Sequence, residues 1–375
     1  MRVVTGLFLV LCSRVGSLNG IEEALRKKVR RTRWHTWMGG DLPSADRLGE
    51  IAALLELDDV RAVLYDHHKQ RKRKKTLRAL RGGLRVLILD GHEMSASYLR
   101  CCEDCLTREI TCNNETRIQY YHRYVMAYLL CEEGRILLDL ELQRKGEGEI
   151  NTATRLVQRL LQNCPRAFNM VAGDALYLDP KLCKLIPQHR KDFVAVLKNE
   201  DRDLIKDFRG LLDFEGRKPL RFKHNGKQCC CHDIEGFTSW TQLGHEVRVV
   251  RSEETSTVRR QRTKEEESIT TEWLWATSLS KEQANTRMIV RIGHGRWDIE
   301  NQGFNELVNH WHADHVYHHD ANAIVAILLL LFLAYNLFHV WVARGLKPQV
   351  RERYTTAHFA KLITAEFYHA LLHPT

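Results

Sequence analysis

Two short apolar segments, each ending on an aspartate, constrain the fold of this chain more than any other feature. Residues 85–91 read RVLILDG, and residues 168–174 read FNMVAGD. A short apolar run that ends at a turn-forming residue is typical of a buried strand. We therefore expect a covered sheet in which Asp90 and Asp174 lie where two strands leave the core.

The segments around these two strands predict the rest of the sheet. The expected elements are strands over residues 120–130, 136–142 and 192–198 and helices over residues 151–163 and 180–186. A tight turn at Glu133-Gly134 predicts that the first two of these strands form an antiparallel hairpin, and Asn151 is the candidate N-cap of the first helix. This order predicts an α/β fold with a mixed five-stranded sheet flanked by helices.

The sequence also predicts how the chain is divided into regions. The expected regions are a helical N-terminal region over 1–82, the first part of the core over 83–198, a β-rich insertion over 199–270, the second part of the core over 271–345, and a C-terminal tail helix over 346–375. The insertion is expected because alternating apolar and polar residues replace the apolar runs of the core.

Three acidic residues carry the predicted chemistry. Asp90 and Asp174 end the two buried strands, and Glu300 lies in the segment GRWDIENQGF at residues 295–304. Any single aspartate at a strand end can simply be a turn former. Three carboxylates together can hold two divalent ions, and their hard oxygen ligands suit Mg²⁺ or Mn²⁺.

These three segments resemble the DDE transposase domain of bacterial insertion sequences. Asp90 in VLILDGHE, Asp174 in MVAGDALY and Glu300 in HGRWDIENQGFNEL look like the three acids of that family. The family carries a Tyr-x2-Arg-x3-Glu-x6-Lys pattern around its glutamate. Arg296 matches the Arg of this pattern, and Glu300 matches its Glu.

Two positions of the pattern differ in this chain. The Tyr position is Gly293 and the Lys position is Leu307, so the chain resembles a divergent member of the family, and His310 is a candidate substitute for the Lys. The resemblance implies that Arg296 contacts a DNA phosphate, for which a guanidinium is well suited. The alternative for Arg296 is a surface ion pair with Glu300 or Asp298.

The resemblance implies an RNase H-like core and a transposase that uses two Mg²⁺ or Mn²⁺ ions per site. It also favours DNA binding by the helical N-terminal region over 1–82, with or without truncation of that region. Its substrates would be the double-stranded DNA of the element ends and of the target, bound by a homodimer in a synaptic complex. We expect it in the bacterial cytoplasm, associated with the nucleoid. The alternatives are an RNase H-like nuclease without strand transfer and a catalytically inactive DNA-binding relic.

The charge of the chain fits a polyanionic partner. The formal net charge is +10 and the pI is about 9.1, which favours nucleic acid without proving it. The densest basic run includes Lys72, Arg73, Lys74 and Lys75. Such a run is either a solvated linker or a surface that contacts DNA phosphates.

Eleven cysteines without an even spacing indicate a reducing compartment rather than a disulfide framework. The candidate ligands of a structural zinc ion are Cys102, Cys105, Cys112 and His122, because Cys-x2-Cys is a common zinc spacing. The alternative is that these cysteines are free buried thiols.

Residues 310–319 hold five histidines, which we expect on one helix that either faces DNA or binds a metal.

Two apolar segments leave a membrane location open as an alternative. Residues 3–12 resemble a short signal peptide but have a poor basic start, so a buried helix is favoured, with a new helix beginning near Ser17. Residues 321–343 are long enough to span a bilayer but contain Asn322, Asn336 and His339. A buried core helix is the preferred interpretation, and no membrane partner is expected.

Overall fold

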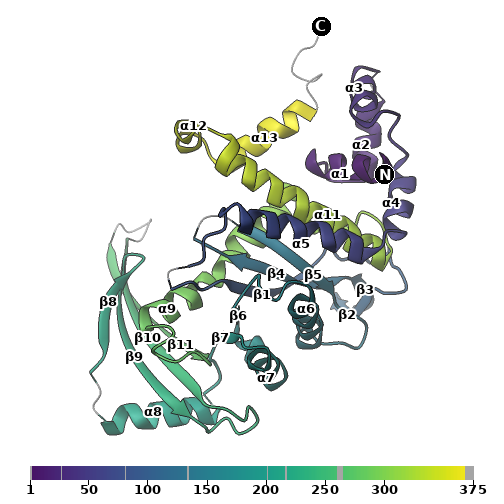
Figure 1. Ribbon diagram of the computed structural model, residues 1–375. Helices are drawn as coiled ribbons and strands as arrows, with labels where there is room; N and C mark the ends of the chain where they lie inside the picture. The colour runs from purple at the N-terminus through teal and green to yellow at the C-terminus, as the bar shows by residue number, and fades with distance from the viewer. Residues whose placement is uncertain are drawn as a thin grey trace. The chain divides into compact units, whose positions relative to one another are not determined.

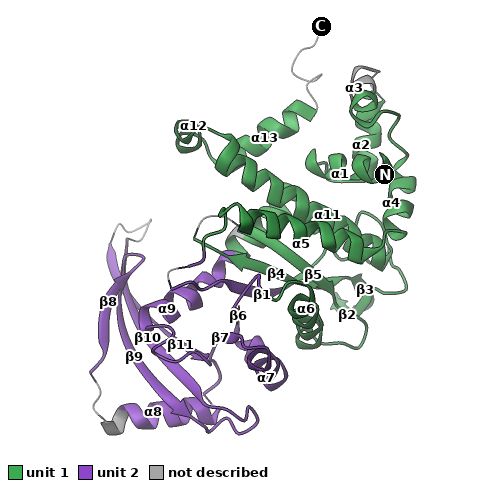
Figure 2. Ribbon diagram, in the orientation of Figure 1, with its two compact units in different colours: residues 1–78, 91–165, 299–375 green, residues 79–90, 166–298 purple. Residues whose placement is uncertain are grey.

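The protein forms two compact units, each assembled from separate stretches of the chain (Figure 2). The computed structural model describes residues 2–26, 28–80, 82–132, 135–200, 202–215, 218–259 and 265–367. Unit 1 comprises residues 1–78, 91–165 and 299–375, and unit 2 comprises residues 79–90 and 166–298. The region boundaries expected from the sequence remain a prediction, and the turn expected at Glu133-Gly134 lies outside the described residues.

Unit 2 is built on a mixed sheet (Figure 1). Its elements are β1 (Val86–Glu93, of which the last three residues belong to unit 1), β6 (Met170–Gly173), the 3₁₀ helix Ala175–Tyr177, α7 (Pro180–Gln188), β7 (Asp192–Val196), α8 (Asp203–Glu215), β8 (Leu220–His224), β9 (Lys227–Phe237), β10 (Val247–Arg259), β11 (Glu266–Thr277) and α9 (Thr286–Gly295). The strand order is β1-β6-β7-β11-β10-β9-β8. β1, β6 and β7 are parallel and the remaining pairs are antiparallel.

The parallel strands are the apolar runs that the sequence identified. Residues 86–89 of β1 and 170–173 of β6 are all buried, as expected for strands covered on both faces. The strand was expected to end at Asp90 but continues to Glu93. Only its fully buried part ends before the aspartate.

The expected β-rich insertion begins with a helix that sequence analysis did not anticipate. α8 buries Leu204, Ile205 and Phe208, and Phe208 packs against Phe237 of β9 with ring centroids 6.0 Å apart. The long antiparallel strands follow, and the last of them, β11, begins at Glu266. β11 therefore contains both the end of the expected insertion and the first residues of the second part of the core.

Unit 1 contains the remaining elements. They are α1 (Arg2–Cys12), α2 (Leu18–Leu25), α3 (Lys28–Met38), α4 (Ala45–Ala53), α5 (Leu57–Arg73), β2 (Leu106–Cys112), β3 (Glu115–Tyr121), β4 (Arg123–Leu130), β5 (Arg135–Leu142), α6 (Glu149–Asn163), the π-helix Ile299–Phe304, α10 (Asn305–Trp311), α11 (Ala321–Val340), the π-helix Trp341–Gly345, α12 (Pro348–Arg353) and α13 (Thr356–Phe367). The strand order is β5-β4-β1, with β2-β3 as a separate hairpin. This mixed α/β order is consistent with an RNase H-like core, and the five strands expected for it correspond to β1, β4, β5, β6 and β7.

Two local predictions in unit 1 were wrong. The strand expected over 120–130 is divided at His122 between β3 and β4. Asn151 is not an N-cap, because α6 begins at Glu149 and the backbone N–H groups of Asn151 and Thr152 already donate to the carbonyl of Gly148. Gly148 is the N-cap, and it provides no side-chain hydrogen bond.

Buried acids on β5 form hydrogen bonds and ion pairs that hold α5 and α6 against the sheet. Asp139 is fully buried, and it accepts hydrogen bonds from Arg159 of α6 and from Arg61 and Tyr65 of α5. Glu141, also buried, pairs with Arg159. A buried charge is tolerated only when its partners are present, so these acids are structural, and burial beside Asp139 raises the pKa of Tyr65.

The long apolar segment forms α11, which lies beside α5 in unit 1 (Figure 1). It is the one described helix that is long and apolar enough to cross a membrane, and 78% of its most apolar window is buried inside the structure. Its asparagines are satisfied there: Asn336 exchanges hydrogen bonds with the backbone of Leu137, and Asn322 donates to the carbonyls of Ala53 and Leu55. This is the packing expected of a core helix.

The apolar N-terminal segment also forms a packed helix. α1 buries Leu7, Val10 and Leu11, and it contacts α11. The next helix begins where the sequence indicated, because the Ser17 hydroxyl accepts a hydrogen bond from the N–H of Gly20 at the start of α2.

In unit 2, α9 lies unusually close to β11. A Cβ atom added to Gly293 would lie 2.2 Å from the indole nitrogen of Trp275, which is fully buried. The neighbouring His294 is paired with the buried Glu254 of β10. Burial alone would raise the pKa of Glu254, but the hydrogen bond to His294 lowers it below its usual value. These contacts fix the end of α9, where Arg296 follows as C-cap.

We predict opposite effects for two glycine-to-alanine changes in helices of unit 2. Gly293→Ala should lower the free energy of unfolding by about 1–3 kcal/mol, because the new methyl group overlaps Trp275. Gly210→Ala in α8 should raise it by up to about 1 kcal/mol, because nothing lies within 4 Å of the added Cβ and alanine favours helix. Urea unfolding of both variants measures these changes, and equal effects would contradict the close packing at Gly293.

Candidate active site

Asp90 lies in β1, and Asp174 directly follows the neighbouring parallel strand β6 in unit 2. The β1–β6 register pairs Val86 with Met170 and Ile88 with Ala172. Continued by two residues, the same register places Asp90 opposite Asp174. Neighbouring strands are about 4.8 Å apart and side chains alternate between faces, so the register directs both carboxylates to the same face of the sheet, where both are half-buried.

Asp174 also shapes the turn that follows β6. Its Oδ1 accepts a hydrogen bond of 2.8 Å from the N–H of Leu176 and caps the 3₁₀ helix. A carboxylate has a second oxygen, so this turn-forming role leaves it able to bind a cation. Gly173 before it is required by packing, because an added Cβ would lie 2.6 Å from the Tyr177 side chain.

Arg296 lies beside Asp90 rather than on the surface. Its Nη1 is 3.7 Å from Oδ2 of Asp90, and the two side chains are only 11% and 17% exposed. This pairing differs from the surface pair with Glu300 or Asp298 that was the alternative for Arg296. A largely buried carboxylate requires nearby positive charge, so this part of unit 2 is built to place cations against Asp90.

Glu300 belongs to unit 1 and lies in the first turn of the π-helix Ile299–Phe304. Its side chain is exposed, whereas the flanking Ile299 is fully buried. Sequence analysis did not anticipate this wide π turn. π-helical turns are rare and are found frequently at functional sites.

Sequence analysis missed two residues of unit 1, His92 and Glu149, which contact residues near Asp90 or Glu300 in the sequence. His92, two residues after Asp90, stacks on Phe304 within unit 1 with ring centroids 4.7 Å apart, and burial lowers its pKa. Glu149, largely buried and paired with Arg123, approaches Gly91 so closely that a Cβ there would lie 2.4 Å from its Oε2. Gly91, directly after Asp90, was the sequence signal for Glu149, because a glycine at that position allows the close approach of this side chain.

The departures from the family pattern have a packing explanation. Gly293 has no space for a tyrosine because Trp275 fills that volume. Leu307 is fully buried in α10, where a lysine ammonium would be costly. His310, the candidate substitute, is exposed, and its role in place of the lysine remains a prediction.

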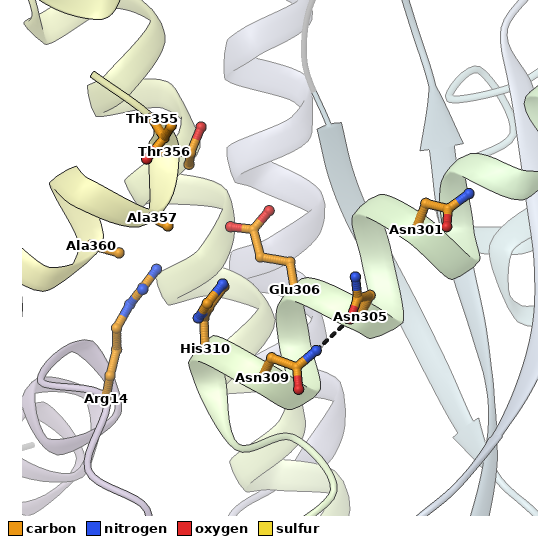
Figure 3. A pocket seen from close by; sticks show the side chains of 10 residues that line it. All are labelled: Arg14, Asn301, Asn305, Glu306, Asn309, His310, Thr355, Thr356, Ala357 and Ala360. Atoms are coloured by element: carbon orange, nitrogen blue, oxygen red, sulfur yellow. Dashed lines mark hydrogen bonds between the residues drawn. The ribbon is translucent and has the colours of Figure 1, made fainter. Parts of the chain in front are cut away.

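His310 lines a pocket in unit 1 (Figure 3). The pocket is lined by Arg14, Asn301, Asn305, Glu306, Asn309, His310, Thr355, Thr356, Ala357 and Ala360. Glu306 is already engaged by His339 at 2.9 Å, and burial lowers the pKa of Arg14 to about 10. The guanidinium of Arg14 stacks on Trp311, 3.9 Å from the ring centroid, so it also supports the packing of α10.

The predicted basic run lies at the end of α5. Arg73, Lys74 and Lys75 are exposed and Lys72 is half-buried, and the helix ends at Arg73, with Lys75 at a φ of 53°. Basic residues at a helix C-terminus are favoured by the helix dipole, so this run has a structural reason for its position as well as a surface available to DNA.

Three of the four candidate zinc ligands meet in unit 1. The sulfurs of Cys102 and Cys105 are 3.5 Å apart, and both lie close to Nε2 of His122. Cys112 is exposed at the far end of β2 and does not join them, whereas His319 does. Burial raises the pKa of Cys102 to about 11, and burial lowers the pKa of His122 and of His319.

The predicted helix carrying the histidines does not form. α10 ends at Trp311, and His312 adopts a left-handed conformation with a φ of 54°. Residues 312–320 are irregular up to the start of α11.

Comparisons with known proteins identify the family of this chain. A comparison with curated proteins gave no match. The solved structures similar to this chain include a piggyBac transposase synaptic complex with hairpin DNA, with 10% sequence identity and a TM-score of 0.40 over 77% of this chain and 54% of that one. The chain thus spans about half the length of that structure. The family model for the transposase DDE domain matches residues 81–337, which is more than half of the chain, and this protein belongs to that family.

Proposed function

We propose that this protein cleaves DNA at the ends of a mobile element and transfers the freed strands into target DNA, with Asp90, Asp174 and Glu300 as its catalytic acids. The observation that carries the proposal is the parallel register that brings Asp90 level with Asp174 in unit 2. Membership of the transposase family supports the reaction class.

A second observation supports Glu300 as the third acid. β1 continues past Asp90 into unit 1, and there His92 stacks on Phe304, four residues after Glu300 on the same π-helix. Within unit 1, the part of β1 that follows Asp90 therefore packs against the π-helix that carries Glu300.

The donor set fits two Mg²⁺ or Mn²⁺ ions, because it consists of carboxylates, one of which already attracts a cationic side chain. When bound, such ions activate the attacking oxygen and stabilise the leaving oxygen of an in-line displacement. Asp90, Asp174 and Glu300 would hold and space them. Arg296 would bind a phosphate oxygen of the reacting strand, because its guanidinium already lies at this carboxylate and can form paired hydrogen bonds.

The same site serves both steps of the proposed reaction. Water first attacks the phosphodiester bond at the element end, and the strand leaves with a free 3′-hydroxyl. That hydroxyl then attacks a phosphodiester bond of the target and displaces another 3′-oxygen. Phosphoryl transfer of this kind depends on positioning and charge neutralisation, and it requires no covalent nucleophile from the protein.

The partners and location follow from this function. DNA contacts would involve the basic run Lys72 to Lys75 as well as Arg296, and two DNA ends imply a homodimer in the synaptic complex. All eleven cysteines are free, which supports the bacterial cytoplasm, where the nucleoid lies, as the place of action.

We predict that Asp90→Asn, Asp174→Asn and Glu300→Gln each reduce transposition by at least about 100-fold, a loss comparable to removing one preorganised charge-stabilising group. Transposition is measured in cells from a donor plasmid that carries the coding sequence with its natural flanking DNA. Asp207→Asn, an exposed acid on α8, is the matched control and should retain full activity.

Binding of Mn²⁺ to the purified variants, followed by electron paramagnetic resonance, provides a readout independent of turnover. Each of the three variants should bind Mn²⁺ more weakly than the wild type. Full transposition by any of them would refute its role. Cleavage without joining would identify the nuclease alternative, and DNA binding without cleavage by the wild type would identify the relic.

The basic run gives a separate prediction. Replacing Lys72, Arg73, Lys74 and Lys75 with alanine should weaken DNA binding at low salt. It should also reduce the slope of log affinity against log salt by roughly 0.9 for each DNA phosphate that the protein no longer neutralises. A variant with alanine at the exposed Lys145, Lys184, Lys206 and Lys361 carries the same charge change. An equal slope for both variants would mean that the run does not bind DNA.

A further inference from the structure

Four soft ligands from two distant parts of the sequence meet in unit 1. Cys102, Cys105, His122 and His319 each offer one ligand atom, and all four atoms lie within 4.8 Å of one another. The first two residues form a Cys-x2-Cys turn, the third separates β3 from β4, and the fourth directly precedes Asp320, the N-cap of α11. None of them is among the proposed catalytic acids.

The distances are close to those of a tetrahedral zinc site. The two sulfurs are 3.5 Å apart, and Nε2 of His122 lies 3.3 Å from the sulfur of Cys102 and 3.2 Å from that of Cys105. Zn–S bonds of about 2.3 Å and Zn–N bonds of about 2.0–2.1 Å give edges of roughly 3.8 Å between sulfurs and roughly 3.5 Å between sulfur and nitrogen. Cys102, Cys105 and His122 would need to move apart by only a few tenths of an ångström to admit the ion, and the ligand atom of His319 lies within 4.8 Å of all three.

The hairpin explains why these residues meet and why Cys112 is excluded. β2 and β3 are paired from Leu106 with Tyr121 at the base to Cys112 with Glu115 at the tip. The base pair brings the adjoining Cys105 and His122 together. Cys112 lies six residues further along the strand than Leu106, which at about 3.4 Å per residue is roughly 20 Å away.

The fourth ligand comes from a segment that the fold already fixes at this place. Ser95 donates both its backbone N–H and its hydroxyl to Asp314, while the N–H of Met94 donates to the carbonyl of His122. His319 is half-buried, and its Nδ1 is buried without a hydrogen-bond partner among the described residues. A buried ring nitrogen without a partner is costly unless it binds something, and one ligand nitrogen of this ring lies within 4.8 Å of the ligand atoms of the two thiols and of His122.

The structure assigns to Cys102, Cys105, His122 and His319 a structural zinc site that joins the base of the β2–β3 hairpin to the start of α11. Two sulfur and two nitrogen ligands in tetrahedral arrangement suit Zn²⁺. Four protein ligands leave no open position for a substrate, so the role is structural. Both thiols lose their protons when the ion binds.

Zinc content is measured on the full-length protein, purified without a polyhistidine tag or chelator, by mass spectrometry of the metal. We expect about one zinc per chain for the wild type. Cys105→Ser and His319→Ala should fall below a tenth of that content. Cys112→Ser and His310→Ala are the matched controls, because both residues are exposed and belong to the same cysteine-rich and histidine-rich segments, and both variants should retain the zinc.

Two further measurements keep the test independent of folding. His319→Cys should retain zinc, because three cysteines and one histidine form another common zinc set. Replacing the zinc of the wild type with Co²⁺ should give the visible absorption of a tetrahedral cobalt–thiolate site. A wild type without zinc, a full equivalent in His319→Ala, a loss in Cys112→Ser as large as in Cys105→Ser, or a Cys102–Cys105 disulfide in place of the metal would each overturn the assignment. DNA is absent from these measurements, so their outcome is independent of the proposed function.

Discussion

The proposed chemistry of this protein depends on one constraint, the in-register parallel pairing of β1 and β6. Both strands are buried apolar runs, so their alignment is enforced by side chains that must remain in the core. A shift of one residue along either strand would move an aspartate into the buried layer or an apolar residue out of it, and either change is costly. The same alignment sets Asp90 level with Asp174. The two carboxylates repel each other, so no contact between them could stabilise this arrangement. Hydrophobic packing of the two strands imposes it instead.

Acids elsewhere in the sheet show what distinguishes a structural carboxylate from a candidate catalytic one. Asp139 also lies on an apolar strand, but it is fully buried and held by Arg61, Arg159 and Tyr65. Its hydrogen-bonding capacity is already used to hold α5 and α6. Asp90 is instead partly accessible and lies 3.7 Å from the guanidinium of Arg296. Accessibility and partners, more than residue type, separate the two roles.

The pattern of apolar residues in the sequence predicted the strands and helices that are buried in a regular pattern. It missed the elements that are mostly exposed or irregular. The five core strands and the buried α11 were found because apolar runs and stripes report directly on burial. The exposed β2–β3 hairpin gives no such signal, because most of its residues face solvent. The end of α10 was missed because it depends on a left-handed backbone at His312, and the π-helix at Glu300 depends on packing rather than on local propensity. The family pattern located Arg296 and Glu300, but only the packing of Trp275 explains why Gly293 replaces the tyrosine.

The cysteine and histidine cluster shows the limit of spacing rules most clearly. Spacing alone pointed to Cys112 as a ligand because it follows Cys105 closely in sequence, yet the antiparallel hairpin separates the two along its whole length. The ligand that the structure supplies, His319, is distant in the chain and lies in a segment whose irregular backbone the sequence did not predict. A metal held by both segments would fix the entry to α11, whose Asn322 and Asn336 bind α4, its following loop and β5. Because α10 and α11 are joined by this segment, zinc would stabilise the part of unit 1 that follows Glu300, while the catalytic acids would bind their own, harder ions.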